Sequence, residues 1–317
     1  MKIAIIGAGA MGCLFGAGLS AVGHDVWLID VMREHVDAIQ KNGLCVEEKS
    51  EDGTYKEHVY KGLKAVTEPE KAGAADLTLI FVKSTVTAQA VCDNKAVFGP
   101  DTIAVTLQNG LGNIEAIDAA IGSGRLLAGT TSHGATMIAP GRVRHAGTGK
   151  TMLGELDGSI SLRLERVVST LNDAGFETQA SDNVLGLLWD KLLVNVGINA
   201  LTAITGLENG RLIELPELEA IMTLAIREGE RVARAMGILL GDPDPAAHVR
   251  AVCSATAENR SSMLQDIQAG RRTEIDMING AIVRAGALLG IDTPTNIVLT
   301  NLVRIRERSG GGQCWKP

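Results

Sequence analysis

Short apolar runs alternate with longer, helix-like segments through about the first third of the chain. Strands that are covered on both faces of a parallel sheet read as continuous apolar runs, and the segments between them supply the crossover helices. The pattern therefore predicts a doubly wound α/β sheet. The predicted strands are Ile3–Ile6, Val26–Ile29, Leu77–Val82 and Ile103–Leu107, and helices are predicted near Leu14–Val22, Arg33–Lys41 and Thr87–Cys92.

A different pattern follows in the stretch Thr130–Gly158, which is rich in Gly and Thr. Apolar and polar residues alternate over short segments such as Gly141–His145 and Thr151–Gly154, as in strands with one exposed face. We interpret this stretch as antiparallel hairpins that extend the sheet. A further amphipathic helix is predicted over Leu162–Ala174.

Beyond about Ser181 apolar residues recur at helical spacing, which predicts an all-α C-terminal domain. We place the boundary there, with domains at 1–181 and 182–317, because Ser181-Asp182-Asn183 can cap an incoming helix. The stretch Ser309–Gly312 and the residues after it are expected to form a flexible tail. Helices are predicted over Leu185–Ala203, Leu218–Met236, Ala246–Gln268, Glu274–Leu289 and Asn296–Arg308.

Composition narrows the class of protein. The 317 residues are enough for two domains, and aromatic residues make up only 3%, so the core is expected to be aliphatic. The net charge is −7 and no basic run is longer than Arg271-Arg272, which argues against a nucleic-acid partner. No stretch reaches the roughly 18 apolar residues that a membrane span needs, so no membrane partner is expected.

The five cysteines are scattered and odd in number, without a CxxC spacing. This argues against a disulfide framework or a structural zinc, and it favours a reducing cytoplasm and no bound metal. The cysteines are Cys13, Cys45, Cys92, Cys253 and Cys314.

The hexapeptide Gly7-Ala8-Gly9-Ala10-Met11-Gly12 satisfies the pattern GxGxxG directly after the first predicted strand and opens a helix-like segment. In that context the first glycine allows a tight turn, the second lets the backbone approach a pyrophosphate, and the third permits close packing of helix on strand. The fold class is therefore an N-terminal Rossmann-like sheet. The alternative is a glycine-rich turn without a ligand.

Asp30 ends the second predicted strand, about twenty residues into the motif, where a carboxylate typically accepts hydrogen bonds from the adenosine ribose. A 2′-phosphate there would be repelled, so NADH is favoured. Arg33 and Lys83 are close enough in the pattern to leave a phosphate site, and hence NADPH, open. A cap at the start of the next helix is the structural alternative for Asp30.

Lys191, Asn195 and Asn199 recur every four residues within an apolar segment, so they lie on one face of a helix. A cation and two amides are costly to bury unless a polar ligand meets them, which indicates a row that faces substrate. A solvated helix face is the alternative, and spacing alone does not decide between them.

Other polar residues carry weaker signals. The clusters Glu258–Ser262 and Arg271–Asp276 are typical of charged helix faces and helix-initiating turns. Asn109 follows a predicted strand at the edge where open α/β sheets bind ligands, although an Asn-Gly pair is more often only a turn. His133 lies in a Gly/Thr-rich loop without an orienting carboxylate nearby in sequence, so a role as general acid is disfavoured.

Taken together, these residues resemble the ketopantoate reductase (2-dehydropantoate 2-reductase) family. The resemblance extends from the first residue to about Ile291, and the stretches Ala257-Glu258-Asn259, Ser261–Ile267 and Thr273–Asp276 are its most specific parts. The matching segments are Lys2–Gly12, Gln108–Gly112, Gly129–His133, Asp190–Thr205, Ala255–Ile267 and Arg272–Gly280.

The resemblance implies roles for individual residues. Lys191 would be the general acid, and Glu274 its partner near the lysine and the cofactor. Asn109 would lie between the nicotinamide and the substrate. Lys83 and Ala135 would contact the cofactor together with the glycine turn. The residues that would hold the substrate are Asn195, Asn199, Asn209, Asn259 and Ser262.

The implied function is reduction of the 2-oxo group of ketopantoate to pantoate, in pantothenate biosynthesis, by hydride transfer from NAD(P)H. The same fold and row would suit a D-mandelate-type 2-hydroxyacid dehydrogenase, and a sensor that binds nicotinamide without catalysis is a third alternative. One departure concerns the cofactor, because Ile29-Asp30-Val31 stands where family members that prefer NADP carry a basic residue. A homodimer stays open.

Overall fold

The computed structural model describes residues 1–50 and 53–309. Of the tail predicted from Ser309 onward, Ser309 is the C-cap of α12, and the residues from 310 onward, Cys314 among them, lie outside the described residues. The chain divides into two compact units. Unit 1 comprises Met1–Gln108 and Asn113–Val184, and unit 2 comprises Asn109–Gly112 and the chain from Leu185 onward.

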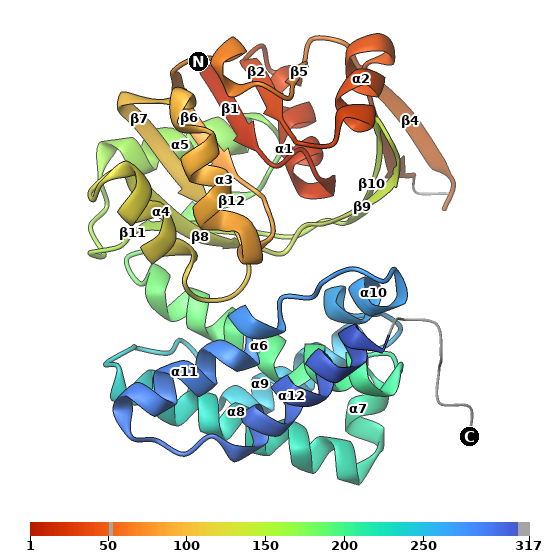
Figure 1. Ribbon diagram of the computed structural model, residues 1–317, viewed down its shortest axis with the longest axis vertical. Coiled ribbons are helices and arrows are strands. Elements are labelled where there is room, and N and C mark those ends of the chain that lie inside the picture. Colours follow the sequence, from red (N-terminus) through yellow and green to blue (C-terminus); the bar gives the residue numbers. More distant parts are fainter. Residues whose placement is uncertain (51–52, 310–317) are drawn as a thin grey trace. The chain divides into compact units, whose positions relative to one another are not determined.

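Unit 1 is built on an eight-stranded sheet with the strand order β12-β11-β8-β7-β6-β1-β2-β5 (Figure 1). All neighbouring strands run parallel except β8 and β11. The predicted parallel strands are confirmed as its centre. The strands are β1 (Lys2–Ile6), β2 (Asp25–Ile29), β5 (Lys64–Val66), β6 (Ala75–Ile80), β7 (Phe98–Thr106), β8 (Leu126–Thr131), β11 (Thr151–Glu155) and β12 (Thr178–Ala180).

In the described part of unit 1, five α-helices connect the strands. The first begins at Ala10, earlier than the predicted Leu14, so the last glycine of the turn lies in its first turn of helix. The helix before β8 was not predicted from the sequence. The helices are α1 (Ala10–Ala21), α2 (Arg33–Asn42), α3 (Thr87–Asp93), α4 (Asn113–Ile121) and α5 (Leu162–Asp173), and short 3-10 turns span Pro69–Lys71, Ser84–Val86 and Lys95–Val97.

A second sheet corrects the interpretation of Thr130–Gly158. Its order is β4-β3-β10-β9, with β3 (Leu44–Lys49), β4 (Tyr55–Tyr60), β9 (Gly134–Ala139) and β10 (Arg142–Gly147). The hairpin of β9 and β10 belongs to this sheet, where β10 pairs in parallel with β3, and only β11 extends the main sheet.

Ion pairs between strands that are distant in sequence explain why the second sheet could not be predicted. Glu47 Oε1 of β3 lies 2.9 Å from Arg142 Nη2 of β10, and Glu47 Oε2 lies 2.7 Å from Arg144 Nη2 of the same strand. The Glu47 side chain is largely buried. The two guanidinium groups hold the pKa of the Glu47 carboxyl below its usual value. Charged residues that look like a solvated loop in the sequence are therefore paired across the sheet.

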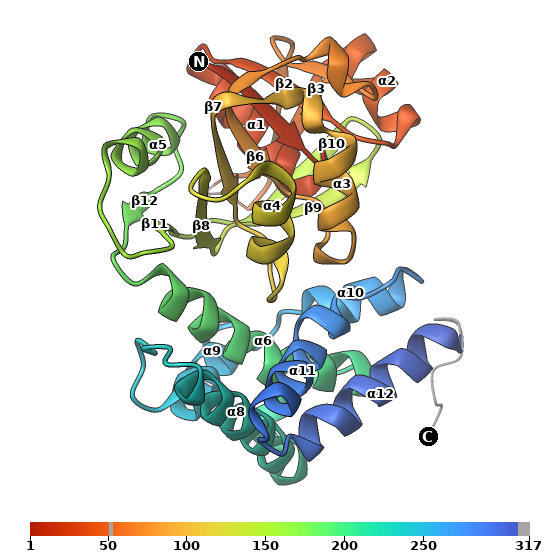
Figure 2. The same cartoon turned by 60° about the vertical axis from the view of Figure 1, so that its left-hand side comes forward.

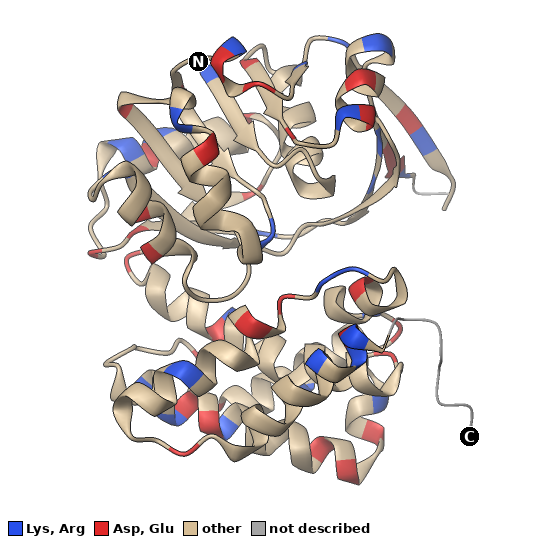
Figure 3. Cartoon of the chain, viewed as in Figure 1, with Lys and Arg blue, Asp and Glu red and all other residues tan. Residues whose placement is uncertain are grey.

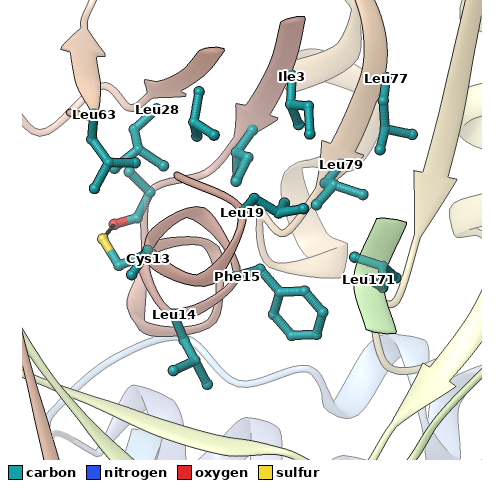
Figure 4. Packing of buried hydrophobic residues seen from close by; sticks show 14 of the residues in the cluster. Ile3, Cys13, Leu14, Phe15, Leu19, Leu28, Leu63, Leu77, Leu79 and Leu171 are labelled. Atoms are coloured by element: carbon teal, nitrogen blue, oxygen red, sulfur yellow. Dashed lines mark hydrogen bonds between the residues drawn. The ribbon is translucent and has the colours of Figure 1, made fainter. Parts of the chain in front are cut away.

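The core of unit 1 is mainly aliphatic, as expected. Leu19 of α1 lies against Ile3 and Leu79 of the sheet, all buried (Figure 4). Phe15 stacks on Phe176 with ring centroids 4.1 Å apart. Each such side chain contributes about 1.5–3 kcal/mol when it is fully buried, so the face of α1 that covers the sheet fixes the helix in place.

Unit 2 is helical (Figure 2). The predicted helix Ala246–Gln268 is wrong as one element: it is interrupted over 256–261, where Ser261 caps a new helix by accepting a hydrogen bond from Leu264 N. The predicted helix from Glu274 begins instead at Asn279, after a 3-10 turn over Ile275–Met277. The helices are α6 (Val184–Thr205), α7 (Arg211–Glu214), α8 (Pro216–Ala235), α9 (Pro245–Ala255), α10 (Ser262–Gln268), α11 (Asn279–Leu289) and α12 (Pro294–Arg308).

The helix α6 is long and apolar enough to be a candidate membrane span, although no such segment was expected from the sequence. It is 22 residues long with a mean hydropathy of 1.4, enough by length and composition to cross a membrane. In this chain 61% of the apolar window is buried inside the protein. A buried core helix meets the same criteria, and α6 occupies that position in unit 2.

A buried polar network joins four helices of unit 2. Asn279 Nδ2 donates to Val196 O of α6 and to Asn296 Oδ1 of α12. Asn296 Nδ2 donates in turn to Ala225 O and to Glu228 Oε2 of α8, at 3.0 and 2.7 Å. The Glu228 carboxylate also accepts from the first amides of α12, which satisfies donors that a helix start leaves open.

We expect Asn296→Ala to lower the free energy of unfolding by about 1–3 kcal/mol, because the buried Glu228 carboxylate loses its side-chain donor and Asn279 Nδ2 loses one of its two acceptors. The exposed Asn301 on the same helix is the matched control, and Asn301→Ala should change the value by no more than about 0.5 kcal/mol. Denaturant titration of the purified variants measures both. Equal effects of the two substitutions would contradict this role of the network.

Candidate active site

Two glycines of the turn after β1 are required by the chain itself. Gly7 has a φ of +93°, and a Cβ on it would lie 2.7 Å from Val82 N. A Cβ on Gly12 would lie only 2.0 Å from Gly7 O. The first turn of α1 therefore approaches the turn and strand more closely than any side chain permits.

Gly9 differs from these two, because nothing in the chain requires a glycine there. Its φ is −64°, which any residue can adopt, and a Cβ on it would meet no atom of the described residues within 4 Å. Gly9 is also the N-cap of α1 and has no side chain that could accept from the amides of the first helical turn. A pyrophosphate that approaches the backbone explains both features. The residues present fit a dinucleotide.

A pocket of about 320 Å³ lies at the carboxyl ends of β1 and β2. Asp30 lines it and is partly buried, with Oδ1 accepting a hydrogen bond from Met32 N at 2.9 Å. The N-cap of α2 is Met32, so Asp30 does not cap the helix, and the bond to Met32 N instead orients the carboxylate within the turn ahead of α2. The pocket is lined by Ile6, Gly7, Ile29, Asp30, Val31, Thr67, Pro69, Val82, Val86, Gln89, Ala90, Asp93 and Asn94.

The charge of this pocket bears on the adenosine half of a cofactor. Among the described residues that line it, Asp30 and Asp93 are charged and none is Lys or Arg. Arg33 is not part of the lining, and its charge helps, after the larger effect of Lys71, to hold the pKa of the Glu68 carboxyl below its usual value. The pocket is therefore negative.

Loops that follow β6 and β7 are fastened by a buried network that the sequence analysis missed. Gln108 Nε2 donates to Val82 O and to Thr87 Oγ1, at 2.6 and 2.8 Å. Thr87 Oγ1 donates to Asn113 Oδ1, and Asn113 Nδ2 donates to Ser84 Oγ. The network flanks Lys83, a predicted cofactor contact at the start of the loop after β6. Ala135, the other predicted contact, lies in β9 of the second sheet.

Lys191 lies in the middle of the apolar helix α6. Desolvation of its ammonium group lowers the pKa to about 8, and the negative charge of Glu274 partly opposes this effect. A lysine that titrates near neutral pH can exchange a proton with a substrate, whereas an exposed lysine stays charged. Lys191 therefore has the protonation behaviour that a general acid needs.

The amides of the predicted row lie on the same face of α6. Asn199 is buried, and its Nδ2 donates to Asn195 Oδ1 at 3.5 Å, a long hydrogen bond. Asn195 Nδ2 is buried and finds no hydrogen-bond partner in the described part of the protein. A buried donor without a partner costs about 1–3 kcal/mol, so a ligand that accepts from it would relieve this penalty.

Asn209 and Asn259 are brought together by the break between α9 and α10. Asn209 N donates to Asn259 O, and Asn209 Nδ2 donates to Thr256 Oγ1, both at 3.0 Å. Within the described chain, the buried Asn209 Oδ1 accepts no hydrogen bond. Asn259 and Ser262 are exposed, and Ser262 is the first residue of α10.

The loop that carries Asn109 docks on the turn that carries Glu274. Leu111 N donates to Met277 O at 2.9 Å, and Met277 N donates back to Glu274 O. Gly110 has a φ of +82°, and a Cβ on it would lie 2.5 Å from Met277 O. The structure therefore brings the two predicted loops together, and Gly110 is required for their contact.

Thr202 is a further residue of α6 that the sequence analysis missed. It follows Asn199 by nearly one turn, is fully buried, and its Oγ1 lies 2.6 Å from Ser261 Oγ. Because Ser261 caps α10, this contact ties the start of α10, and with it Ser262, to the polar row. A threonine on an apolar helix gives no signal that separates it from ordinary core positions.

His133 pairs with another histidine and not with a carboxylate. Its Nδ1 lies 3.2 Å from His145 Nε2, and its ring packs edge-on against Phe15 and Phe176. Burial, and the nearby His145, lower its pKa. Among the residues with described positions, no group of three His, Cys, Asp or Glu side chains could share a metal ion.

The parallel sheet, the glycine turn and the helical unit with its desolvated lysine define a dinucleotide-binding oxidoreductase. Two family models match the chain: "Ketopantoate reductase PanE/ApbA" over residues 3–158 and "Ketopantoate reductase PanE/ApbA C terminal" over residues 183–307. The chain belongs to the ketopantoate reductase family.

Individual relatives agree with this assignment. The chain is 36% identical to a 2-dehydropantoate 2-reductase of Halobacterium salinarum, over 98% of this chain and 100% of that protein. It is 38% identical to that of Pyrococcus horikoshii, over 98% and 99%. Members of the family use a nicotinamide cofactor and a small 2-oxo acid.

Solved structures have the same fold. A PanE/ApbA family ketopantoate reductase from Ralstonia eutropha JMP134 is 37% identical, with a TM-score of 0.90 over 98% of this chain and 99% of that chain. A D-mandelate dehydrogenase solved with NADH and anilino(oxo)acetate is 32% identical, with a TM-score of 0.91 over the same shares.

The difference between Gly9 and Gly12 gives a direct test of the glycine turn. We expect Gly9→Ala to keep the free energy of unfolding within about 1 kcal/mol, because the added methyl group meets no atom of the chain. The same variant should bind reduced nicotinamide dinucleotide at least about tenfold more weakly, because the methyl group occupies the space of the phosphates.

Gly12→Ala is the contrasting variant, since its methyl group collides with Gly7 O, and it should lower the yield or stability of folded protein. Denaturant titration and calorimetric titration with NADH separate the two effects. Unchanged NADH affinity in a folded Gly9→Ala protein would refute the proposed approach of the phosphates to Gly9.

Proposed function

We propose that this chain reduces the 2-oxo group of ketopantoate to pantoate, a step of pantothenate biosynthesis, with Lys191 as the general acid. The observation that supports the assignment most directly is a lysine with a pKa of about 8 in the apolar helix of a ketopantoate reductase family member. The reduced nicotinamide supplies a hydride to the carbonyl carbon when it is bound.

The residues of unit 2 supply the remaining chemistry. Negative charge builds up on the carbonyl oxygen as the hydride arrives, and the Lys191 ammonium stabilises that charge and then donates its proton there. The charge of Glu274 raises the protonated fraction of Lys191, which desolvation would otherwise reduce further.

We assign the substrate oxygens to the amides and the hydroxyl of the row. Asn195 Nδ2, the donor left without a partner among the described residues, would donate to a substrate oxygen. Asn199, Asn209 and Asn259 would also bind substrate oxygens, and the Ser262 hydroxyl would donate to the substrate carboxylate. Asn109 would lie beside the nicotinamide, on the loop fixed to the Glu274 turn.

A D-mandelate-type 2-hydroxyacid dehydrogenase is the second candidate, because such an enzyme has the same fold at 32% identity. A comparison of kcat/KM for ketopantoate, benzoylformate and branched 2-oxo acids distinguishes the two. A protein that binds the cofactor without turning over any of these acids would instead be the sensor alternative.

We infer a cytoplasmic enzyme without nucleic-acid or membrane partners. The net charge of −7 argues against a nucleic-acid partner. The burial of α6 within unit 2 is consistent with the lack of a membrane partner. Cys13 and Cys253 are buried thiols, and burial raises the pKa of both, as is usual for unreactive cysteines in a reducing compartment.

The pKa of Lys191 predicts how the rate depends on pH. The protonated fraction falls as pH rises through about 8, so kcat/KM for oxo-acid reduction should fall about tenfold for each pH unit above 8. The reverse reaction, oxidation of the hydroxy acid, needs the neutral amine of Lys191, so its kcat/KM should rise over the same pH range. Steady-state profiles from about pH 6 to pH 10 measure both.

Two variants assign this titration to Lys191. Lys191→Ala should lower kcat by about 10²–10⁴-fold while the protein still binds the cofactor. Lys191→Arg should remove the decline near pH 8 from whatever activity remains, because a guanidinium keeps its proton. Persistence of that decline in Lys191→Arg would assign the titration to another group.

The negative pocket at Asp30 leads us to propose NADH as the preferred cofactor. Asp30→Ala should lower kcat/KM for NADH by about 10–100-fold, through the loss of charged hydrogen bonds to the ribose, and should raise it for NADPH. Asp30→Asn separates the two effects, because it keeps an acceptor for Met32 N but removes the repulsion of a 2′-phosphate. A parent enzyme that strongly favours NADPH would show that basic neighbours outweigh Asp30.

A further inference from the structure

The turn that carries Glu274 has little secondary structure of its own. It is a 3-10 turn of three residues, Ile275–Met277, with Glu274 as its N-cap. Such a short element contains few internal hydrogen bonds, so its conformation depends on the groups that pack against it. Thr273 and Ile275, on either side of Glu274, are each 1% exposed. Their backbone amides therefore need partners within the protein, and Ile275 N finds one in Thr273 Oγ1 at 3.2 Å.

The second half of α12 binds this turn at two points. Basic residues occupy that half of the helix (Figure 3), and the carboxylate of Glu307 lies among them. Glu307 Oε1 accepts a hydrogen bond from Thr273 N at 2.7 Å. Arg304 Nε and Nη2 both donate to Asp276 Oδ1, at 2.9 and 2.6 Å. Arg304 and Glu307 are three residues apart, so one face of α12 holds the turn one residue before and two residues after Glu274.

Other charged groups strengthen the contact at Asp276. Desolvation raises the pKa of the Asp276 carboxyl, but the hydrogen bonds and charges of Arg304 and then Arg272 outweigh it and hold the pKa below its usual value. Arg284 of α11 donates to Asp276 O at 2.8 Å. Asp276 is thus ionised, and α11 and α12 both bind it.

The lysine at the other side of this arrangement depends on Glu274. Desolvation lowers the pKa of Lys191, and the charge that opposes this effect is that of Glu274. Asp190, the neighbour of Lys191 on α6, is engaged elsewhere, since its Oδ2 accepts from Gly241 N at 3.0 Å. The position of the Glu274 carboxylate therefore decides how strongly the lysine holds its proton.

We propose that Arg304 and Glu307 are positioning residues for the proposed reaction. By holding the turn on both sides of Glu274, they keep its carboxylate near the Lys191 ammonium, where its charge keeps the lysine protonated. The inference rests on the proposed roles of Lys191 and Glu274. The start of α12 is itself fixed by the Glu228 carboxylate of α8, so the whole helix is braced against the turn.

Loss of either contact should be visible in the pH profile. Arg304→Ala and Glu307→Ala each release the turn at one point, which lets the Glu274 carboxylate move away from Lys191. The midpoint at which kcat/KM for ketopantoate reduction declines should therefore move from about pH 8 to about 0.5–1 pH unit lower. At about pH 9 this is a loss of about three- to tenfold. The dissociation constant of NADH should change by less than about twofold.

The direction of the shift separates positioning from a direct effect of charge. Loss of a nearby cation by itself would raise the pKa of a lysine, so a downward shift in Arg304→Ala has to come from the displaced carboxylate. The Arg304 side chain is 43% exposed, and its removal disturbs little packing. This variant therefore carries the test if Glu307→Ala does not fold.

Conservative variants and a control on the same helix complete the set. Glu307→Gln keeps an acceptor for Thr273 N and should have the midpoint of the parent within about 0.2 pH unit. Arg304→Lys keeps a cationic donor for Asp276 and should recover at least about half of the shift. Arg308→Ala removes an exposed cation one turn beyond Arg304 and should leave the midpoint unchanged.

The Glu274→Gln background tests whether α12 acts through Glu274. This substitution removes the charge, so the midpoint should fall at least as far as in Glu307→Ala. Adding Glu307→Ala to Glu274→Gln should then cause no further shift beyond about 0.2 pH unit. A merely structural role of α12 would shift the midpoint equally in both backgrounds and would overturn the proposal.

Titration of Lys191 itself gives a readout that needs no substrate. The pH dependence of its acetylation by acetic anhydride, measured by peptide mass spectrometry on the full chain, reports the same midpoint. A parent in which Lys191 does not titrate near pH 8 would refute the proposed function and this inference with it. A parent that titrates as expected, with unshifted midpoints in Arg304→Ala and Glu307→Ala, would overturn the positioning role alone.

Discussion

Desolvation of the Lys191 ammonium is the constraint on which the chemistry of this chain depends. The apolar surroundings of α6 lower its pKa from 10.5 to about 8, which corresponds to about 3 kcal/mol against the charged form. Hydrogen bonds from neighbouring helices fix the helix that carries this charge. Asn279 Nδ2 donates to Val196 O, little more than one turn beyond Lys191, and the network continues through Asn296 to the Glu228 carboxylate.

The same constraint explains the geometry of the turn that carries Glu274. Glu274 must stay near the lysine, because a mobile carboxylate would be screened by water and would raise the pKa less. Its backbone carbonyl accepts from Met277 N, and Met277 O accepts from Leu111 N. The absence of a Cβ on Gly110 permits this contact. One rigid turn therefore positions both the acidic partner of Lys191 and the loop of Asn109.

The main sheet and the polar row could be predicted because each has a local signal: continuous apolar runs in one case and a four-residue spacing in the other. The second sheet could not, since the ion pairs of Glu47 join residues nearly a hundred positions apart. The break between α9 and α10 was also missed, because apolar residues continue at helical spacing across it, and the Ser261 side chain that caps α10 also contacts Thr202 of α6. The role of Glu274 as the partner of Lys191 was inferred from the family resemblance, because the position of Glu274 in the sequence gives no signal for it.

The arrangement of the row also explains why one fold serves related acids. In our proposal Lys191, Asn195 and Ser262 meet the carbonyl and carboxylate oxygens, which every 2-oxo acid carries. Hydrogen bonds to these shared atoms raise the rate for all such substrates alike and leave discrimination to the contacts of the acyl substituent. Apolar contacts differ by only about 1–3 kcal/mol between similar substituents. A ketopantoate reductase and a D-mandelate dehydrogenase can therefore have the same helical unit and differ in a few side chains around it.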